Sequence, residues 1–162
     1  EESGAAQYYR DVRVTTIYEG TNGIQAMDLV GRKLMDGGEA AYSLVDEIEK
    51  TVKSCPEDFS SMVGEVMLAS KALREAIKWM CSQKNINDRF SGAVPFLNAF
   101  ARVLGGYFHL KSAIQEEHVG PRTKLARFYI LNLLPEYIGL LQQAQQGCED
   151  LYSFSPNEML EA

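Results

Sequence analysis

Hydrophobic residues recur at intervals of three and four along most of the chain, which is the period of an amphipathic helix. The pattern predicts helices at about residues 24–36, 40–54, 56–81, 92–118 and 122–146. Turn formers punctuate it, with Gly37-Gly38 after the first helix and Gly120-Pro121 before the last. We expect Pro135 to kink the last helix, because proline removes one helix hydrogen bond and clashes with the preceding turn.

Several segments depart from this pattern. Residues 12–18 read VRVTTIY, a β-branched run that favours a strand or an extended loop. Residues 84–88 read KNIND and are expected to form a polar connection. Residues 151–162 are expected to be a loosely held tail, and Glu116 and Glu117 to lie on a solvated surface. These exceptions leave the helical interpretation of the rest intact.

The last four predicted helices, joined by short connections, are typical of an all-α, up-down four-helix bundle. Within the fourth predicted helix, Gly105 and Gly106 each cost about 1 kcal/mol relative to alanine. Such a cost indicates a close approach by another helix or a ligand, and helix packing is the favoured interpretation.

Composition narrows the function classes. Hydrophobic residues make up 46% and charged residues 23%, a globular balance. Sixteen Lys and Arg against 22 Asp and Glu give a net charge of −6, which argues against binding nucleic acid or anionic membrane. No apolar run reaches the ~20 residues that cross a bilayer. Three widely spaced cysteines match neither a disulfide framework nor a CxxC motif, so a reducing, cytoplasmic location is expected.

Neither a metal site nor a complete protein is expected. His109 and His118 are nine residues apart, whereas helical ligand pairs are three or four apart. The chain begins with Glu1 and its first methionine is Met27. We therefore expect a processed chain, or a piece of a longer one.

The segment EGTNG, residues 19–23, is the one segment whose sequence the helical bundle does not explain. Glu19 follows the apolar pair Ile17-Tyr18, and apolar neighbours disfavour the charged form of a carboxylate, which suits it to general-base work. Gly20 would let a substrate approach the backbone. The amides that open the next helix would form a seat for phosphate. The alternative is an ordinary capped turn with an exposed carboxylate.

Residues 9–34, YRDVRVTTIYEGTNGIQAMDLVGRKL, closely resemble the catalytic segment of acyl-CoA dehydrogenases. The exact residues of this motif are most similar to the branch of this family that has an added C-terminal helical domain. That branch includes the 3-methylmercaptopropionyl-CoA dehydrogenases. The resemblance implies that residues 1–36 end the family's helical domain and carry its catalytic loop. Residues 37–150 would then be the added bundle, and residues 151–162 a tail.

The resemblance also implies a role for each residue of the loop. Glu19 matches the base that removes the α-proton of an acyl-CoA thioester, giving a trans-2-enoyl-CoA, and Gly20 matches a position at the substrate. Thr21, Asn22 and Gly23 match positions that contact FAD. Many family members have polar pairs where this chain has Asn22-Gly23, so a cofactor contact at Gly23 would be made by backbone.

The full-length protein implied is an FAD-dependent, homo-oligomeric oxidoreductase of fatty-acid metabolism that passes electrons to an electron-transferring flavoprotein. The family's N-terminal helical and middle β-domains have no counterpart in these 162 residues. We therefore expect the isolated chain to be inactive and not to hold FAD tightly. The alternative is a non-catalytic docking or oligomerisation module.

Overall fold

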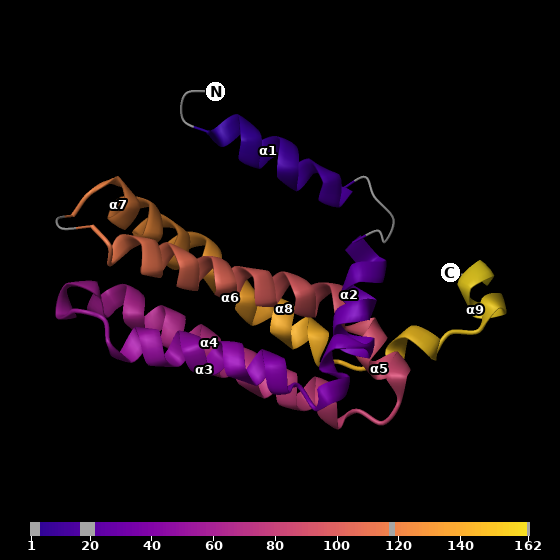
Figure 1. The fold of residues 1–162 in the computed structure, drawn as a ribbon. Helices are drawn as coiled ribbons and strands as arrows, with labels where there is room; N and C mark the ends of the chain where they lie inside the picture. The colour runs from indigo at the N-terminus through magenta and orange to yellow at the C-terminus, as the bar shows by residue number, and fades with distance from the viewer. Residues whose placement is uncertain (1–3, 17–21, 117–118, 162) are drawn as a thin grey trace.

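The computed structural model describes residues 4–16, 22–116 and 119–161, and every regular element in those ranges is helical (Figure 1). The predicted all-α class is therefore confirmed. No helix in the described part of the chain is both long and apolar enough to cross a membrane.

Long helices lying side by side form the body of the fold (Figure 1). They are α3 (Glu39–Lys53), α4 (Ser60–Ser82), α6 (Ala93–Ala113) and a final rod that contains α7 (Pro121–Phe128) and α8 (Tyr137–Ala144). Helix α6 is central, because it packs against α4, α7, α8 and the earlier helix α2. The predicted bundle is confirmed, and its helices begin and end close to the predicted positions.

The final rod is less regular than the single helix predicted at residues 122–146. A π-helical turn, Tyr129–Leu133, follows α7, and a 3₁₀ turn, Leu134–Glu136, leads into α8. Pro135 lies in the first turn of the 3₁₀ segment, so α-helical hydrogen bonding is interrupted there, as predicted. The π turn had no signal in the hydrophobic period.

The N-terminal prediction needs a correction. Helix α1 (Ala5–Arg13) continues into a 3₁₀ turn, Val14–Thr16, so a strand or extended loop at residues 12–16 is wrong. Residues 17 and 18 lie outside the described residues. The hydroxyl of Thr15 donates to the carbonyl of Val12 at 2.7 Å, which satisfies its polar group within the helix. β-Propensity reflects packing against a neighbouring strand, and no strand is present among the described residues to provide it.

The predicted polar connection at residues 84–88 is also wrong in part, because helix α5 (Ile86–Ser91) starts within it. The side chain of Asn85 caps this helix and accepts a hydrogen bond from the amide of Asn87 at 3.0 Å. Phe90 packs its ring edge against Gly31 of α2. A cap and one half-buried aromatic side chain therefore fix a short helix that the hydrophobic pattern does not reveal.

Helix α2 (Asn22–Gly31) crosses one end of the bundle (Figure 1). It is followed by a 3₁₀ turn, Lys33–Asp36, and by Gly37 and Gly38, whose φ angles are 78° and 84°. These left-handed conformations favour glycine and confirm the predicted stop. The carboxylate of Asp36 accepts hydrogen bonds from the amides of Ala40 (3.2 Å) and Gly38 (2.7 Å), which lower its pKa.

One continuous apolar core joins the bundle to α2. Ser70 is the one polar residue among the buried side chains of the described ranges, and its hydroxyl donates to the carbonyl of Met67. Burial of apolar surface provides most of the driving force for this fold. The largest fully buried side chains come from α2, α3, α4, α6 and the final rod: Tyr107, Phe96, Ile48, Leu73, Ile77, Met80, Leu110, Ile130, Leu134, Val30, Val45 and Val52.

The C-terminal tail carries a 3₁₀ turn, Asp150–Tyr152, and the short helix α9 (Pro156–Glu161). Its apolar side chains are exposed, among them Leu151, Phe154, Met159 and Leu160. The predicted tail is therefore partly helical, and these side chains lie outside the core.

Candidate functional site

The candidate catalytic loop lies only partly within the described residues. Glu19, Gly20 and Thr21 fall outside them, so their predicted roles stay predictions. Asn22 and Gly23 are described and form the first turn of α2. Asn22 is exposed and Gly23 half-buried, so the start of this helix is open to a ligand.

The electrostatics of that helix start favour an anion. The first amides of a helix have no partner within the helix and carry the positive end of its dipole. No acidic residue lies in the first turn of α2. These features fit a phosphate-bearing edge of a cofactor such as FAD, with Asn22 and Gly23 supplying amide groups.

Helix α2 holds this start on a rigid base. Ala26 and Val30 are fully buried against the core. Arg32, the residue that follows α2, pairs with Asp28 of that helix through two contacts, at 2.6 and 2.9 Å. The hydrogen bond from Arg32, reinforced by its charge, lowers the pKa of Asp28, so this carboxylate is ionised at neutral pH. The position of the first turn of α2 is therefore set by the packing of this helix against the bundle.

Upstream of the loop, helix α1 presents polar and apolar side chains to solvent. Gln7 donates to Asp11 at 2.8 Å and accepts from Arg10 at 3.1 Å, so these hydrogen bonds run through an amide side chain. None of its residues is buried, and the side chains of Tyr8 and Tyr9 are 74% and 68% exposed. Helix α1 therefore has an apolar surface that the described residues leave uncovered.

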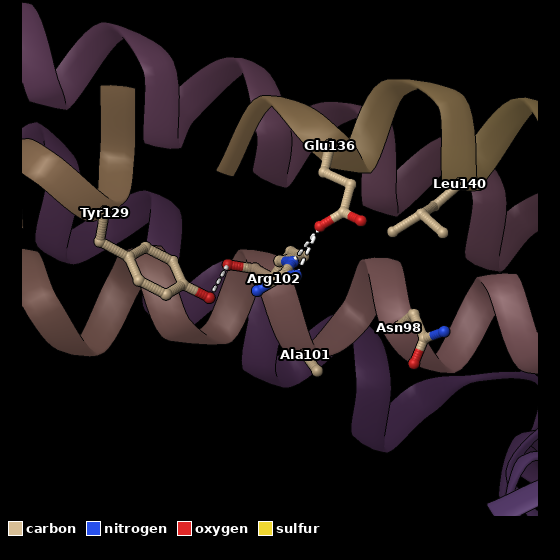
Figure 2. A pocket seen from close by; sticks show the side chains of 6 residues that line it. All are labelled: Asn98, Ala101, Arg102, Tyr129, Glu136 and Leu140. Carbon is tan, nitrogen blue, oxygen red and sulfur yellow. Dashed lines mark hydrogen bonds and ion pairs between the residues drawn. The ribbon is translucent and has the colours of Figure 1, made fainter. Parts of the chain in front are cut away.

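A second polar cluster lines a surface hollow of about 330 Å³ between α6 and the final rod. We call it the Arg102 hollow, and its lining residues are Asn98, Ala101, Arg102, Tyr129, Glu136 and Leu140 (Figure 2). The guanidinium of Arg102 meets the carboxylate of Glu136 at 2.5 Å. Tyr129 directs its hydroxyl to the carbonyl oxygen of Arg102 at 3.4 Å (Figure 2).

The close approach predicted at the glycine pair lies beside this hollow, because Tyr129 takes part in both. A Cβ on Gly105 would lie 2.1 Å from the hydroxyl oxygen of Tyr129, and a Cβ on Gly106 would lie 3.2 Å from Leu134. The packing interpretation of Gly105-Gly106 is therefore confirmed. His109 packs on the ring of Tyr129 with centroids 4.6 Å apart, whereas His118 lies outside the described residues.

Within the described ranges, no group of three or more His, Cys, Asp and Glu side chains is placed so that it could hold a metal ion. The Arg102 hollow was not predicted from the sequence. Its residues are spread over more than forty positions, from Asn98 to Leu140, and only the glycine pair signalled a close approach.

Comparison with known proteins identifies the family to which the chain belongs. Residues 44–155 match the family model described as acetyl-CoA dehydrogenase C-terminal like, a stretch that begins in α3 and ends in the tail. The chain is 34% identical over 124 residues to a 3-methylmercaptopropionyl-CoA dehydrogenase of Ruegeria pomeroyi, covering 72% of this chain and 21% of the relative. It is 29% identical over 180 residues to a butyryl-CoA dehydrogenase of Syntrophomonas wolfei, covering 99% of this chain and 29% of the relative.

The chain thus spans between about a fifth and a third of the length of these relatives. The proposed domain boundaries after residues 36 and 150 stay predictions. The family match covers more than half of the chain and includes most of the bundle. The chain belongs to the acyl-CoA dehydrogenase family and represents its C-terminal region.

Proposed function

We propose that this chain is the C-terminal part of an FAD-dependent acyl-CoA dehydrogenase in which Glu19 is the catalytic base. The observation that carries the proposal is the segment at residues 9–34, which is continuous with a bundle of the matching family. The names of the relatives support an acyl-CoA thioester as the substrate class.

In this proposal, the carboxylate of Glu19 removes the proton from the α-carbon of the thioester. The backbone amide of the same residue donates to the thioester carbonyl and stabilises the charge that develops there. Gly20 leaves room for the substrate to approach the chain. A carboxylate alone is too weak for this proton, so the rest of the driving force must come from these donors and from the cofactor.

FAD would supply the hydride acceptor for the β-carbon. The residues that would hold it are Thr21, Asn22 and Gly23, the last two at the positive end of α2. Helix α2 fixes the position of Asn22 and Gly23 through the buried side chains of Ala26 and Val30. Because only the end of the proposed site lies in this chain, we expect the isolated chain neither to bind FAD tightly nor to turn over substrate.

The proposal extends to the whole protein. It would form a homo-oligomer in the cytoplasm and pass electrons to an electron-transferring flavoprotein. The test uses the full-length protein with and without Glu19→Gln, and follows the visible flavin bands as acyl-CoA is added without oxygen. Bleaching in the wild type and persistence in the variant support the proposal, and equal bleaching contradicts it.

The alternative function, a docking or oligomerisation module without chemistry, draws on the uncovered apolar surface of α1. Tyr8, Tyr9 and Val12 are all more than half exposed on this helix. A chain that acts only through contacts should self-associate or bind another domain, as large exposed apolar patches do. Sedimentation of the chain and of Tyr8→Ser/Val12→Ser separates the two, because only a docking role on α1 makes assembly depend on these side chains.

A further inference from the structure

Two unusual features of the helices lie beside the Arg102 hollow. Tyr129 sits in a π turn, a rare element that often occurs at functional sites. Opposite it, Gly105 lies in the interior of α6, where glycine lowers helix stability. Only a residue without a Cβ leaves room there for the Tyr129 hydroxyl. The π turn and the glycine together let the Tyr129 hydroxyl lie beside the backbone of Arg102.

The charged pair that lines the hollow leaves one carboxylate oxygen of Glu136 and some N–H groups of Arg102 without a partner in the pair. Glu136 receives Arg102 on a single oxygen, Oε2, through both Nε and Nη2. Its second oxygen points toward Leu140 (Figure 2). Hydrogen bonding with Tyr129 and Glu136 raises the pKa of Arg102, so the guanidinium keeps its charge and its remaining N–H donors. A ligand in the hollow can therefore donate to Glu136 and accept from Arg102.

The surroundings select further among ligands. The pair is neutral as a whole, and the carboxylate of Glu136 repels an anion, so a phosphate group does not fit beside it. Leu140 and Ala101 add apolar surface, and the amide of Asn98 provides one more donor and acceptor. A volume of about 330 Å³ is at the lower end of small-ligand sites and suits a planar ring with an attached sugar.

We propose that the Arg102 hollow binds the base of an adenine nucleoside or nucleotide. The exocyclic amino group N6 of adenine donates to Glu136, and the ring nitrogen N1 beside it accepts from Arg102. The apolar faces of Leu140 and Ala101 cover one side of the ring. The existence of this site is independent of Glu19, whereas its natural ligand, the adenine end of coenzyme A or of FAD, rests on the proposed function.

The test measures binding of adenosine to the 162-residue chain by NMR titration. We expect a dissociation constant on the order of 1 mM, as for a small ligand in a half-open hollow. Inosine reverses the donor and the acceptor on this edge, so it should bind about tenfold more weakly. Binding of both nucleosides with equal affinity, or no binding of adenosine up to about 10 mM, would overturn the proposal.

Variants locate the site. Arg102→Ala and Glu136→Ala should each weaken adenosine binding about tenfold, and both should fold, because a partly exposed ion pair contributes little stability. Arg74→Ala is the matched control, since Arg74 also bridges two helices, through Asp46 and Glu49, away from the hollow. Loss of binding in the control as well, with all variants folded by circular dichroism, contradicts the assignment.

Competition then identifies the source of the adenine. Coenzyme A and FAD are each titrated against bound adenosine. Displacement by coenzyme A alone assigns the hollow to the substrate, and displacement by FAD alone assigns it to the cofactor. Displacement by neither, with adenosine bound, overturns the link to the dehydrogenase but not the site. The flavin-bleaching test of Glu19 is read separately, so failure of either proposal is recognised on its own.

Discussion

Gly92, between α5 and α6, is the position where the structure allows least change. A Cβ there would lie 2.1 Å from the carbonyl oxygen of Ala144 and 2.8 Å from its carbon. Carbon and oxygen atoms pack no closer than about 3.3 Å, so the two helices must separate by about 1 Å. The obstacle is backbone of α8 and cannot rotate away. Gly92→Ala should therefore cost about 3 kcal/mol, the upper end of the range for overpacking.

The assay is thermal unfolding followed by circular dichroism. For a domain of this size each kcal/mol shifts Tm by about 2–4 °C, so Gly92→Ala should lower Tm by about 6–12 °C. Gly64→Ala is the matched control, because Gly64 lies within α4 with no atom within 4 Å of the new Cβ. It should raise stability by up to about 1 kcal/mol. A Gly92→Ala protein as stable as wild type would refute the close approach of α6 and α8.

Three further predictions concern packing and capping. Gly105→Ala should destabilise the chain by about 1 kcal/mol in urea unfolding, because the clash with the tyrosine hydroxyl exceeds the gain in helix propensity, while Gly139→Ala, with open space around it, should not destabilise it. Leu73→Ala should cost about 2–5 kcal/mol in the same assay, whereas Leu68→Ala, 56% exposed on the same helix, should change stability by less than about 0.5 kcal/mol. Partial burial raises the pKa of Glu116, but hydrogen bonds from three backbone amides and one hydroxyl at the start of α7 outweigh it and hold the pKa below its ordinary value. The stability that this carboxylate contributes is present at pH values above the ordinary pKa of a glutamate and is lost as the pH falls through and below that pKa. Glu116→Gln should therefore flatten the acid side of the plot of unfolding free energy against pH. A steep acid loss in the Gln variant would exclude the cap as its cause.

The bundle could be predicted from the sequence because its cause is local and repeated. Apolar residues at helical spacing define faces that must be buried, and glycine pairs mark positions where only glycine fits. Gly37-Gly38 adopts left-handed angles, and Gly105-Gly106 lies under a neighbouring helix, as the sequence suggested. Each signal is short and local in the sequence, although the side chains that fill the space beside Gly105 and Gly106 come from the final rod.

The errors arose where particular contacts, and not the hydrophobic period, decide the structure. Residues 12–16 are rich in β-branched side chains but helical, because β-propensity has no partner strand to act on in the described part of the chain. Glu116 is half-buried and not simply solvated, because its carboxylate caps the start of α7 through Thr123 and its neighbours, a contact that the sequence pattern does not predict. The Arg102 hollow depends on a π turn and on the pairing of α6 with the final rod. None of these contacts leaves a periodic signal in the sequence.

The proposed catalytic role of Glu19 depends on the resemblance of one short segment to a known loop. The most direct test is the anaerobic titration of the full-length protein with acyl-CoA, recorded through the visible flavin spectrum. We expect the bands to bleach in the wild type and to persist in Glu19→Gln, with flavin bound in both. Bleaching at the same rate and extent in the variant would contradict the assignment of Glu19 as the base.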